Sequence, residues 1–471
     1  MLTVLRAGSI SAVELLEFHI DRIQRLNPAI NAIVFRDFDR ARSAARAADR
    51  HRAAGEDAPL LGLPITIKDC IYVEGLPATG GFAPRKNAIA ERDALSTARL
   101  RSVGAVIMGN TNVPPFAGDW QTDNSIYGRT NNPWNLNFTS GGSTGGGAAA
   151  VAAGLSPIEL GGDFSGSIRV PAAFCGVYGH KSSETVAARS GQFPASNRPN
   201  GATAMSVQGP LARSAEDLEL ILNVIAGPEI GEDVAWRIEL PPPRHDRIDN
   251  FRVGLWRSPQ WLPVDDEIQA ALESVAQTLR TIGAVVDYVQ PVYLDDFKQY
   301  AKTYLSIMTA INSAGKPPEM RRKNAELFRS TGDEFLGAFA SGVDSSAADY
   351  IRWFSERERY RVAYRKFFKN WDILLAPAQM VNAFRHDDRS QLERSLEVNG
   401  RQVPYLHLAV IPGLCNLVGH PGTAFPAGRT GSGLPIGLQA IGPYLEDQTT
   451  IRFAELMASE IGGFIPPPGF A

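Results

Sequence analysis

The sequence predicts an α/β fold, in which a mixed, mainly parallel β-sheet is flanked by helices on both faces. Residues 253–255 have the pattern of a strand, an amphipathic helix follows from Asp265, and residues 285–289 predict the next strand. This strand–helix–strand order is typical of parallel strands joined by a crossover helix. A composition with 44% hydrophobic and 21% charged residues is that of an ordinary globular protein.

The N-terminal part of the chain predicts two helices. Ser11 and Glu14 form the S-x-x-E pattern of a capping box, in which two side chains satisfy free N–H groups at the start of a helix. Apolar residues follow at helical spacing, and Pro28 is expected to end the segment. A second helix, rich in alanine and arginine, is expected over about residues 37–53.

The next elements lead into a stretch that is poor in large side chains. Residues 63–67 and 105–108 predict strands. Residues 140–166 contain many glycines, and residues 148–153 among them predict a helix closed by Gly154. Because glycine has no side chain, this stretch lets backbone approach backbone, or a substrate approach both.

The second half of the chain predicts a linker, a helical segment and further strands. The proline-rich residues 241–243 are the best linker candidate, and the segment from about residue 300 to 370 is expected to be helical. Strand signals return in the tail, at residues 372–375, 422–426 and 436–441. We therefore expect one compact α/β domain with a helical insertion.

The bulk composition argues against several classes of function. Interspersed basic and acidic residues give a formal net charge of −3, so there is no electrostatic reason to expect nucleic acid or an anionic membrane as partner. Sparse cysteines and scattered histidines match no disulfide scaffold and no metal-ligand spacing. The apolar run at the start is too short for a signal peptide, and no run is long enough to span a bilayer. We expect a cytoplasmic enzyme without a metal.

Three short segments contain residue types that carry chemistry. Lys68 ends an apolar strand, Ser143 lies in a glycine-rich loop, and Ser167 follows Gly166 in a second tight turn. Taken singly, each has a plain alternative: a solvated lysine, a loop that lacks the lysine of a phosphate-binding loop, and a turn with an N-cap serine. Successive N–H groups around a serine nevertheless suit nucleophilic attack and oxyanion stabilisation in one loop.

Together, these segments closely resemble the amidase signature family, along nearly the whole chain. The most specific part is the glycine- and serine-rich signature over residues 141–181. Family-like sequence also occurs at residues 11–15, 27–28, 109–112, 130–134, 209–214 and 434–439. The resemblance implies a single amidase signature domain over residues 1–471, with a signature core at about 61–225 and the helical insertion at about 300–370.

The resemblance implies that Lys68, Ser143 and Ser167 form the family's Lys–cis-Ser–Ser triad. Lys68, with a pKa lowered by burial, would draw a proton from Ser143, which would draw one from Ser167. Ser167 would attack the carbonyl carbon of a linear, non-peptide carboxylic amide and form an acyl-enzyme, which water then hydrolyses. The resemblance implies that this reaction uses no cofactor. The backbone N–H groups expected to hold the oxyanion belong to Phe164, Ser165, Gly166 and Ser167.

Other signature positions are expected to support the loops. Asp163 and Arg169 match supporting positions and are assigned to loop structure. Thr144 stands where serine is commoner and keeps the hydroxyl. Ser165 stands where the family usually has glycine, so a side chain there either narrows the oxyanion loop or adds a hydroxyl donor. Cys70 stands where asparagine is frequent, and a buried, inert thiol is expected there.

The substrate is not readable beyond a small-molecule amide. Phe116, Trp120 and Tyr127 lie in a loop that borders the pocket in the family, and they would favour aromatic or long aliphatic acyl groups. The oligomeric state is open, and a homodimer is compatible with the sequence.

Four alternatives stay open at this point. An α/β-hydrolase would use Ser143 as nucleophile with His407 or His420, and a penicillin-recognising enzyme would use the S-x-x-K pattern at residues 313–316. Within the family, the glutamine-hydrolysing, A-type component of an amidotransferase is the nearest alternative. An amidase-like protein that binds without catalysis is the last, and Ser165 is the residue that motivates it.

Overall fold

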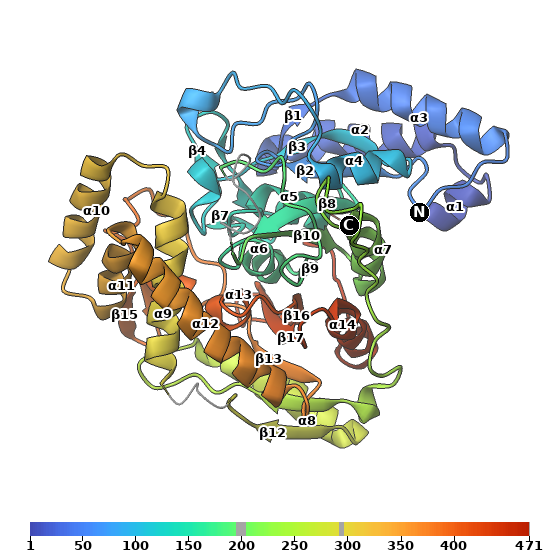
Figure 1. The fold of residues 1–471 in the computed structure, drawn as a ribbon. Coiled ribbons are helices and arrows are strands. Elements are labelled where there is room, and N and C mark those ends of the chain that lie inside the picture. The colour runs from blue at the N-terminus through green and yellow to red at the C-terminus, as the bar shows by residue number, and fades with distance from the viewer. Residues whose placement is uncertain (195–203, 292–295, 471) are drawn as a thin grey trace.

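The computed structural model describes residues 1–194, 204–291 and 296–470, and a large β-sheet runs through it (Figure 1). This sheet has eleven strands. In spatial order they are β1 (Ile33–Arg36), β3 (Val106–Thr111), β2 (Pro64–Lys68), β8 (Ile158–Asp163), β10 (Val207–Ala212), β9 (Tyr178–Lys181), β16 (Gly422–Arg429), β17 (Pro435–Ile441), β13 (Ile373–Pro377), β11 (Arg252–Leu255) and β12 (Val285–Tyr288).

The pairing makes this a mixed sheet in an α/β protein, as predicted. Parallel pairs join β2 to β3 and β8, and β11 to β12 and β13. Antiparallel pairs join β1 to β3 and connect β8, β10, β9, β16, β17 and β13 in turn. Parallel pairing is therefore less extensive than the strand–helix–strand pattern suggested. The reason is that β9 and β10, like β16 and β17, are consecutive strands that pair antiparallel and need no crossover helix.

Helices cover both faces of the sheet. On one face α5 (Gly145–Ala152) packs on α6 (Arg169–Cys175), and on the other α7 (Ala215–Ile225) packs on α14 (Asp447–Ile461). Successive residues of β9 separate these layers: Gly179 abuts Ala172 of α6, whereas the His180 ring bonds Asp447 of α14 at 3.0 Å. Because side chains of a strand alternate between faces, the two helix pairs lie on opposite sides.

The N-terminal helix α2 (Ala12–Ile30) begins as predicted and ends later than predicted. Ser11 and Glu14 form both hydrogen bonds of the capping box. Pro28 lies inside the last turn, and the helix ends at Asn31, which adopts a left-handed conformation with φ 55°. The expectation that Pro28 ends the helix is wrong, because the helix is closed by the left-handed Asn31, whose N–H donates to the Asn27 carbonyl. The next helix, α3 (Phe38–Ala53), follows its prediction.

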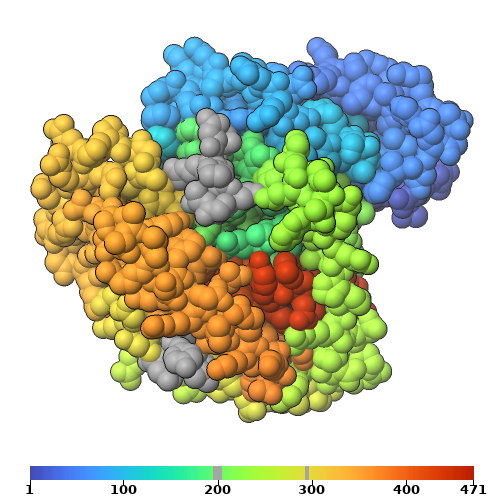
Figure 2. All heavy atoms as spheres, viewed as in Figure 1, coloured from blue at the N-terminus to red at the C-terminus, as the bar shows by residue number. Residues whose placement is uncertain are grey.

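The second half of the chain contains the predicted strand–helix–strand unit and the helical segment. Helix α8 (Asp266–Ile282) is capped by Asp265 and connects β11 to β12, which pair in parallel. Figure 2 shows the following helical segment, in yellow and orange, along one flank of the visible face. Its helices are α9 (Phe297–Ser313), α10 (Pro318–Ser330), α11 (Glu334–Val343) and α12 (Ala347–Phe367).

Shorter elements complete the described chain. The helices are α1 (Leu2–Arg6), α4 (Leu95–Ser102) and α13 (Gly413–Asn416). Small two-stranded ribbons pair β4 (Asp123–Asn124) with β5 (Gly128–Arg129), β6 (Asn131–Asn132) with β7 (Asn135–Thr139), and β14 (Ser395–Val398) with β15 (Arg401–Pro404).

Candidate active site

Lys68 is the last residue of β2 and is buried, with 1% of its surface exposed. Its Nζ donates hydrogen bonds to Ser143 Oγ at 2.8 Å, to Thr144 Oγ1 at 2.8 Å and to the Gly162 carbonyl at 3.1 Å. Burial lowers the pKa of Lys68 below its usual value, although nearby acidic groups act in the opposite direction. A lysine in this setting becomes a neutral amine at a lower pH than an exposed one.

Ser143 lies in the glycine-rich loop before α5 and is 1% exposed. The Gly142–Ser143 peptide bond is cis. This loop is pressed against the chain at Asp119, since a Cβ on Gly142 would lie 2.2 Å from the Asp119 carbonyl oxygen. Every residue of α5 is buried, which its glycines and alanines allow. The small residues therefore let the loop seat Ser143 against Lys68.

Ser167 lies in the turn between β8 and α6 and is 9% exposed. Gly166 before it has φ 81°, and a Cβ there would lie 2.7 Å from Pro412 Cγ, so the turn requires glycine. The Ser167 carbonyl accepts a hydrogen bond from the Thr144 N–H at 3.0 Å, which joins this turn to the loop of Ser143. The structure thus places Lys68 against Ser143 and joins their loop to the turn of Ser167 through the backbone. Within the described chain, no hydrogen bond links the hydroxyls of Ser143 and Ser167.

The Asp163 carboxylate organises the turn that carries Ser167. It accepts a hydrogen bond from the Gly166 N–H at 2.9 Å and pairs with the Arg169 guanidinium at 3.1 Å, and neither charged side chain is exposed. Burial alone would raise the pKa of Asp163, but the Arg169 guanidinium holds it below its usual value. Arg169 also donates to Gln439 Oε1 at 2.5 Å and to Asn416 Oδ1. These contacts anchor the turn to the C-terminal part of the chain.

The four N–H groups expected to hold the oxyanion are not equivalent. The Gly166 N–H is already used, because it donates to Asp163 Oδ1. The N–H groups of Phe164, Ser165 and Ser167 donate to no acceptor within the described residues. The expectation is therefore corrected for Gly166, whose N–H closes the turn and is not free for a ligand.

Ser165 is held by two aromatic residues. The Tyr304 hydroxyl, from α9, donates to Ser165 Oγ at 2.8 Å and approaches the Phe164 carbonyl at 3.4 Å. On another side, Trp120 Nε1 donates to the Ser165 carbonyl at 3.1 Å. Tyr304 is a site residue that the sequence analysis misses, because it is a buried aromatic in an ordinary helical pattern, 139 residues from Ser165. No local signal marks it.

The three aromatic residues predicted to border the pocket have different surroundings. Trp120 is buried and contacts the loop before Ser167, as described above. Phe116 is 46% exposed and packs its ring against Phe82, with centroids 4.0 Å apart. Tyr127 is half-buried, and burial raises its pKa to about 12, with Asp69 acting in the same direction. Trp120 is thus the best supported of the three as a residue of the site.

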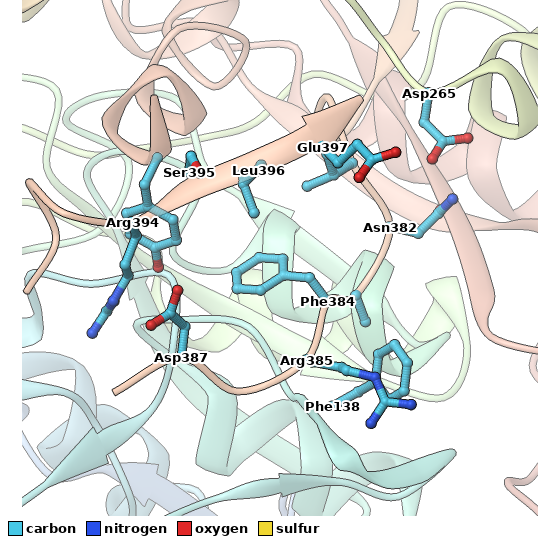
Figure 3. A pocket seen from close by; sticks show the side chains of 13 residues that line it. Phe138, Asp265, Asn382, Phe384, Arg385, Asp387, Arg394, Ser395, Leu396 and Glu397 are labelled. Carbon is cyan, nitrogen blue, oxygen red and sulfur yellow. The ribbon is translucent and has the colours of Figure 1, made fainter. Parts of the chain in front are cut away.

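A cavity of about 370 Å³ opens beside strand β14 (Figure 3). Phe384, Tyr405 and Arg394 are among the residues that line it, and none of the described lining residues is a predicted catalytic residue. Tyr405 and Arg394 both donate to the Asp119 carboxylate, at 2.5 and 2.7 Å. The cavity is therefore separate from the triad, and Asp119, which abuts Gly142, lies between them.

Comparison with known proteins assigns the chain to a family. A model of the family described as Amidase matches residues 14–451. The chain belongs to the amidase family. The resemblance to amidase signature hydrolases is thereby confirmed over nearly the whole chain.

Relatives within the amidase family have several described activities. The A-type component of the glutamyl-tRNA(Gln) amidotransferase of Roseiflexus castenholzii is 33% identical, with 96% of this chain and 93% of that protein covered. Indoleacetamide hydrolase of Bradyrhizobium diazoefficiens is 34% identical, with 94% and 82% covered. The solved structure of a bacterial aryl acylamidase, also an amidase signature enzyme, superposes with a TM-score of 0.83 at 27% identity, covering 98% of this chain and 95% of that one.

Membership of the amidase family agrees with the surroundings of the histidines. The α/β-hydrolase alternative pairs Ser143 with His407 or His420. Within the described residues neither ring has a hydrogen bond to Ser143: the His407 ring bonds Asp333 at 3.0 Å, and the buried His420 ring donates to the Gly442 carbonyl at 2.9 Å. Within residues 1–194, 204–291 and 296–470, no cluster of three or more His, Cys, Asp or Glu could hold a metal ion. Over the same ranges, no helix has the length and hydropathy to cross a bilayer.

Proposed function

We propose that this protein hydrolyses carboxylic amides through an acyl-enzyme, with Ser167 as nucleophile, Ser143 as proton relay and Lys68 as base. The observation that carries the proposal is the buried Lys68 amine, 2.8 Å from the Ser143 hydroxyl and beside the turn of Ser167. A serine needs an adjacent base to attack at neutral pH, and burial favours the uncharged form of lysine.

The hydrogen bonds of Lys68 indicate how its neutral amine would act. A neutral amine has two protons and one lone pair. The Gly162 carbonyl can only accept, and the Thr144 hydroxyl can accept from Lys68 while donating to that carbonyl at 3.4 Å. When both amine protons are used in this way, the lone pair remains for the Ser143 proton. Thr144 would thus direct the base, a role that its hydroxyl fills as well as serine would.

In the proposed reaction, Lys68 takes the proton of Ser143 while Ser143 takes that of Ser167. Ser167 Oγ bonds to the amide carbon, and the oxyanion accepts hydrogen bonds from the N–H groups of the turn that have no acceptor within the described residues, those of Phe164, Ser165 and Ser167. The proton returns through Ser143 to the amine as the C–N bond breaks. Water then attacks the acyl-enzyme through the same relay. No step of this scheme needs a metal ion or a cofactor.

A fluorophosphonate labelling experiment tests this function. Such a reagent forms a stable bond with an activated serine, so we expect covalent labelling of the wild type at Ser167 and none of Ser167→Ala. Mass spectrometry of a digest locates the modified residue. A protein that binds amides without cleaving them would neither be labelled nor release an amine, and that result would overturn the proposal.

For the substrate we propose an uncharged linear amide with an aryl or arylacetyl group. The support is the indole of Trp120 beside the loop of Ser167, together with similarity to an indoleacetamide hydrolase and to an aryl acylamidase. The test compares kcat/KM for indoleacetamide, an anilide, a short aliphatic amide and glutamine. We expect the two aromatic amides to be the better substrates, and a preference for the aliphatic amide or glutamine would contradict this.

The glutamine-hydrolysing component of an amidotransferase is the second candidate. The observation in its favour is the 33% identity to the A-type component of a glutamyl-tRNA(Gln) amidotransferase, over 96% of this chain. It predicts that the purified chain hydrolyses glutamine only with partner proteins and glutamyl-tRNA. Turnover of aromatic amides by the isolated chain, with no stimulation by tRNA, would decide for the first candidate.

A further inference from the structure

Ser165 departs from the glycine that is usual in the amidase signature, yet the backbone there does not require glycine. Of the two residues before Ser167, it is Gly166 that has a positive φ, 81°, and Ser165 does not. The serine side chain is therefore accommodated without left-handed strain. The side chain also makes a specific contact, because its hydroxyl oxygen accepts a 2.8 Å hydrogen bond from the Tyr304 hydroxyl.

The contacts of Tyr304 constrain the direction of one particular N–H group. In a trans peptide the carbonyl and the following N–H point in opposite directions. The Phe164 carbonyl faces the Tyr304 hydroxyl at 3.4 Å, so the N–H of Ser165 points away from α9. That N–H has no acceptor within the described residues, as a donor reserved for a ligand requires.

Trp120 fixes the next peptide unit in the same way. Its indole N–H donates to the Ser165 carbonyl at 3.1 Å, and the Gly166 N–H on the opposite side donates to Asp163 at 2.9 Å. The Phe164–Ser165 and Ser165–Gly166 peptide units are thus each held by a contact. Of these contacts, only the one with Tyr304 involves a hydrogen bond to the side chain of Ser165.

Tyr304 is well suited to hold this position. It is completely buried in α9, and its ring lies against Gly413, where a Cβ would come within 2.7 Å of the ring. Burial raises the pKa of Tyr304 well above its usual value, so its hydroxyl stays a donor over the whole working range.

We infer that Tyr304 is a positioning residue of the amidase reaction, which acts through Ser165 to aim the Ser165 N–H at the oxyanion. The inference rests on the proposed function, since it needs Ser167 to form a tetrahedral intermediate. It assigns the helical segment a part in catalysis through this one hydroxyl. It also explains how this chain uses a serine where the signature usually has glycine.

A double-mutant cycle tests the inference with Tyr304→Phe, Ser165→Ala and the double variant. For the panel amide that the wild type cleaves fastest, each single change is expected to lower kcat about tenfold, less than loss of an oxyanion donor, with KM within twofold. The double variant is expected to be no slower than the slower single one, because both changes remove the same hydrogen bond. Independent, multiplying losses, or losses in KM rather than kcat, would overturn the inference.

Tyr300→Phe is the matched control for a buried hydroxyl lost from the same helix. Tyr300 donates to the carbonyls of Gly413 and Leu414, at 3.0 Å each, and to no residue of the Ser167 turn. Its kcat should stay within twofold of the wild type, and a loss as large as that of Tyr304→Phe would make the effect a general one of α9 and overturn the inference.

Labelling by the fluorophosphonate separates the two proposals. If the wild type is labelled and turns over amides while Tyr304→Phe behaves like it, the positioning role alone fails. If the wild type is neither labelled nor active, the proposed function fails, and the positioning role falls with it.

Discussion

The N–H of Thr144 donates a 3.0 Å hydrogen bond to the carbonyl of Ser167. This bond joins two loops that are distinct in the sequence, and it places Ser143, the neighbour of Thr144, beside the turn of Ser167. Through Ser143 the contact extends to the Lys68 amine. The candidate site is therefore one connected unit of three chain segments, and the predictions below concern its parts.

The two serines are expected to respond differently to substitution. Ser167→Ala removes the nucleophile, so kcat should fall by about 10⁴-fold or more. Ser143→Ala should leave a small residual activity, because Lys68 or a water molecule can still reach the Ser167 proton. Ser140→Ala, a buried serine of the same loop whose hydroxyl has no partner in the described chain, is the control and should keep near wild-type rates. Wild-type rates in both catalytic variants would refute the mechanism.

The rate should depend on pH through Lys68. Its pKa is lowered by burial, and only the unprotonated amine is a base, so the active fraction grows as the pH rises through this lowered value. We expect kcat/KM to rise with pH and level off below the usual lysine pKa of 10.5. A pH–rate profile with one stable amide measures this, and Lys68→Met should abolish activity. An inflexion at the ordinary lysine pKa would contradict the prediction.

Removing Arg169 should destabilise the fold. Arg169→Met leaves the Asp163 carboxylate buried without its partner, which costs about 3–5 kcal/mol of unfolding free energy. Denaturant unfolding measures the loss. The control is Arg389→Met, whose pair with Asp387 is 57% exposed on the arginine side and should change stability little. Equal effects of the two substitutions would show that the buried pair is not what anchors the turn.

Gly166 should tolerate alanine less well than a glycine of similar conformation. Both Gly166 and Gly433 have positive φ, 81° and 86°, so alanine at either adds about 1–2 kcal/mol of strain. At Gly166 the new Cβ also meets Pro412 at 2.7 Å, whereas at Gly433 nothing lies within 4 Å. Gly166→Ala should therefore show the larger drop in Tm and lose activity, while Gly433→Ala stays active. Similar Tm values for both would exclude the steric contribution.

The cysteines should be unreactive in the native protein. Cys70, Cys175 and Cys415 are free and buried, and burial raises the pKa of Cys70 to about 11. Iodoacetamide at pH 8 should therefore modify no thiol and leave activity intact, whereas denaturant should expose all three. Mass spectrometry counts the adducts, and modification of native Cys70 would contradict its assignment as an inert thiol.

Local patterns predicted much of the fold. The capping box at Ser11 and the N-cap at Asp265 involve side chains a few residues from the groups they satisfy, so the sequence contains both partners. The same holds for the Ser143 loop, whose small residues are contiguous. The helix end near Pro28 is not predictable in the same way, because it depends on the following turn, where Asn31 takes the left-handed conformation.

The rest of the site depends on contacts across long sequence distances. Tyr304 reaches Ser165, and Gln439 reaches Arg169, over 139 and 270 residues. The sequence around Tyr304 has the pattern of ordinary core packing, and the family-like segment 434–439 does not show which distant residue Gln439 contacts. The hydrogen bond from the Gly166 N–H to Asp163 is not predictable from the sequence either. A motif shows which N–H donors are present, but it does not show which of them already have an acceptor in the folded protein.

The position of β16 and β17 has a consequence for how the protein folds during its synthesis. These strands lie between β9 and β13, so they alone connect the two parts of the described sheet, yet every other strand of that sheet precedes them in the chain. A nascent chain that stops before residue 422 contains Lys68, Ser143 and Ser167, but it lacks the two strands that join β9 to β13. We therefore expect that the fold, and with it any activity, is completed only after these two strands have left the ribosome, and that the unpaired edges of β9 and β13 are prone to aggregation until then.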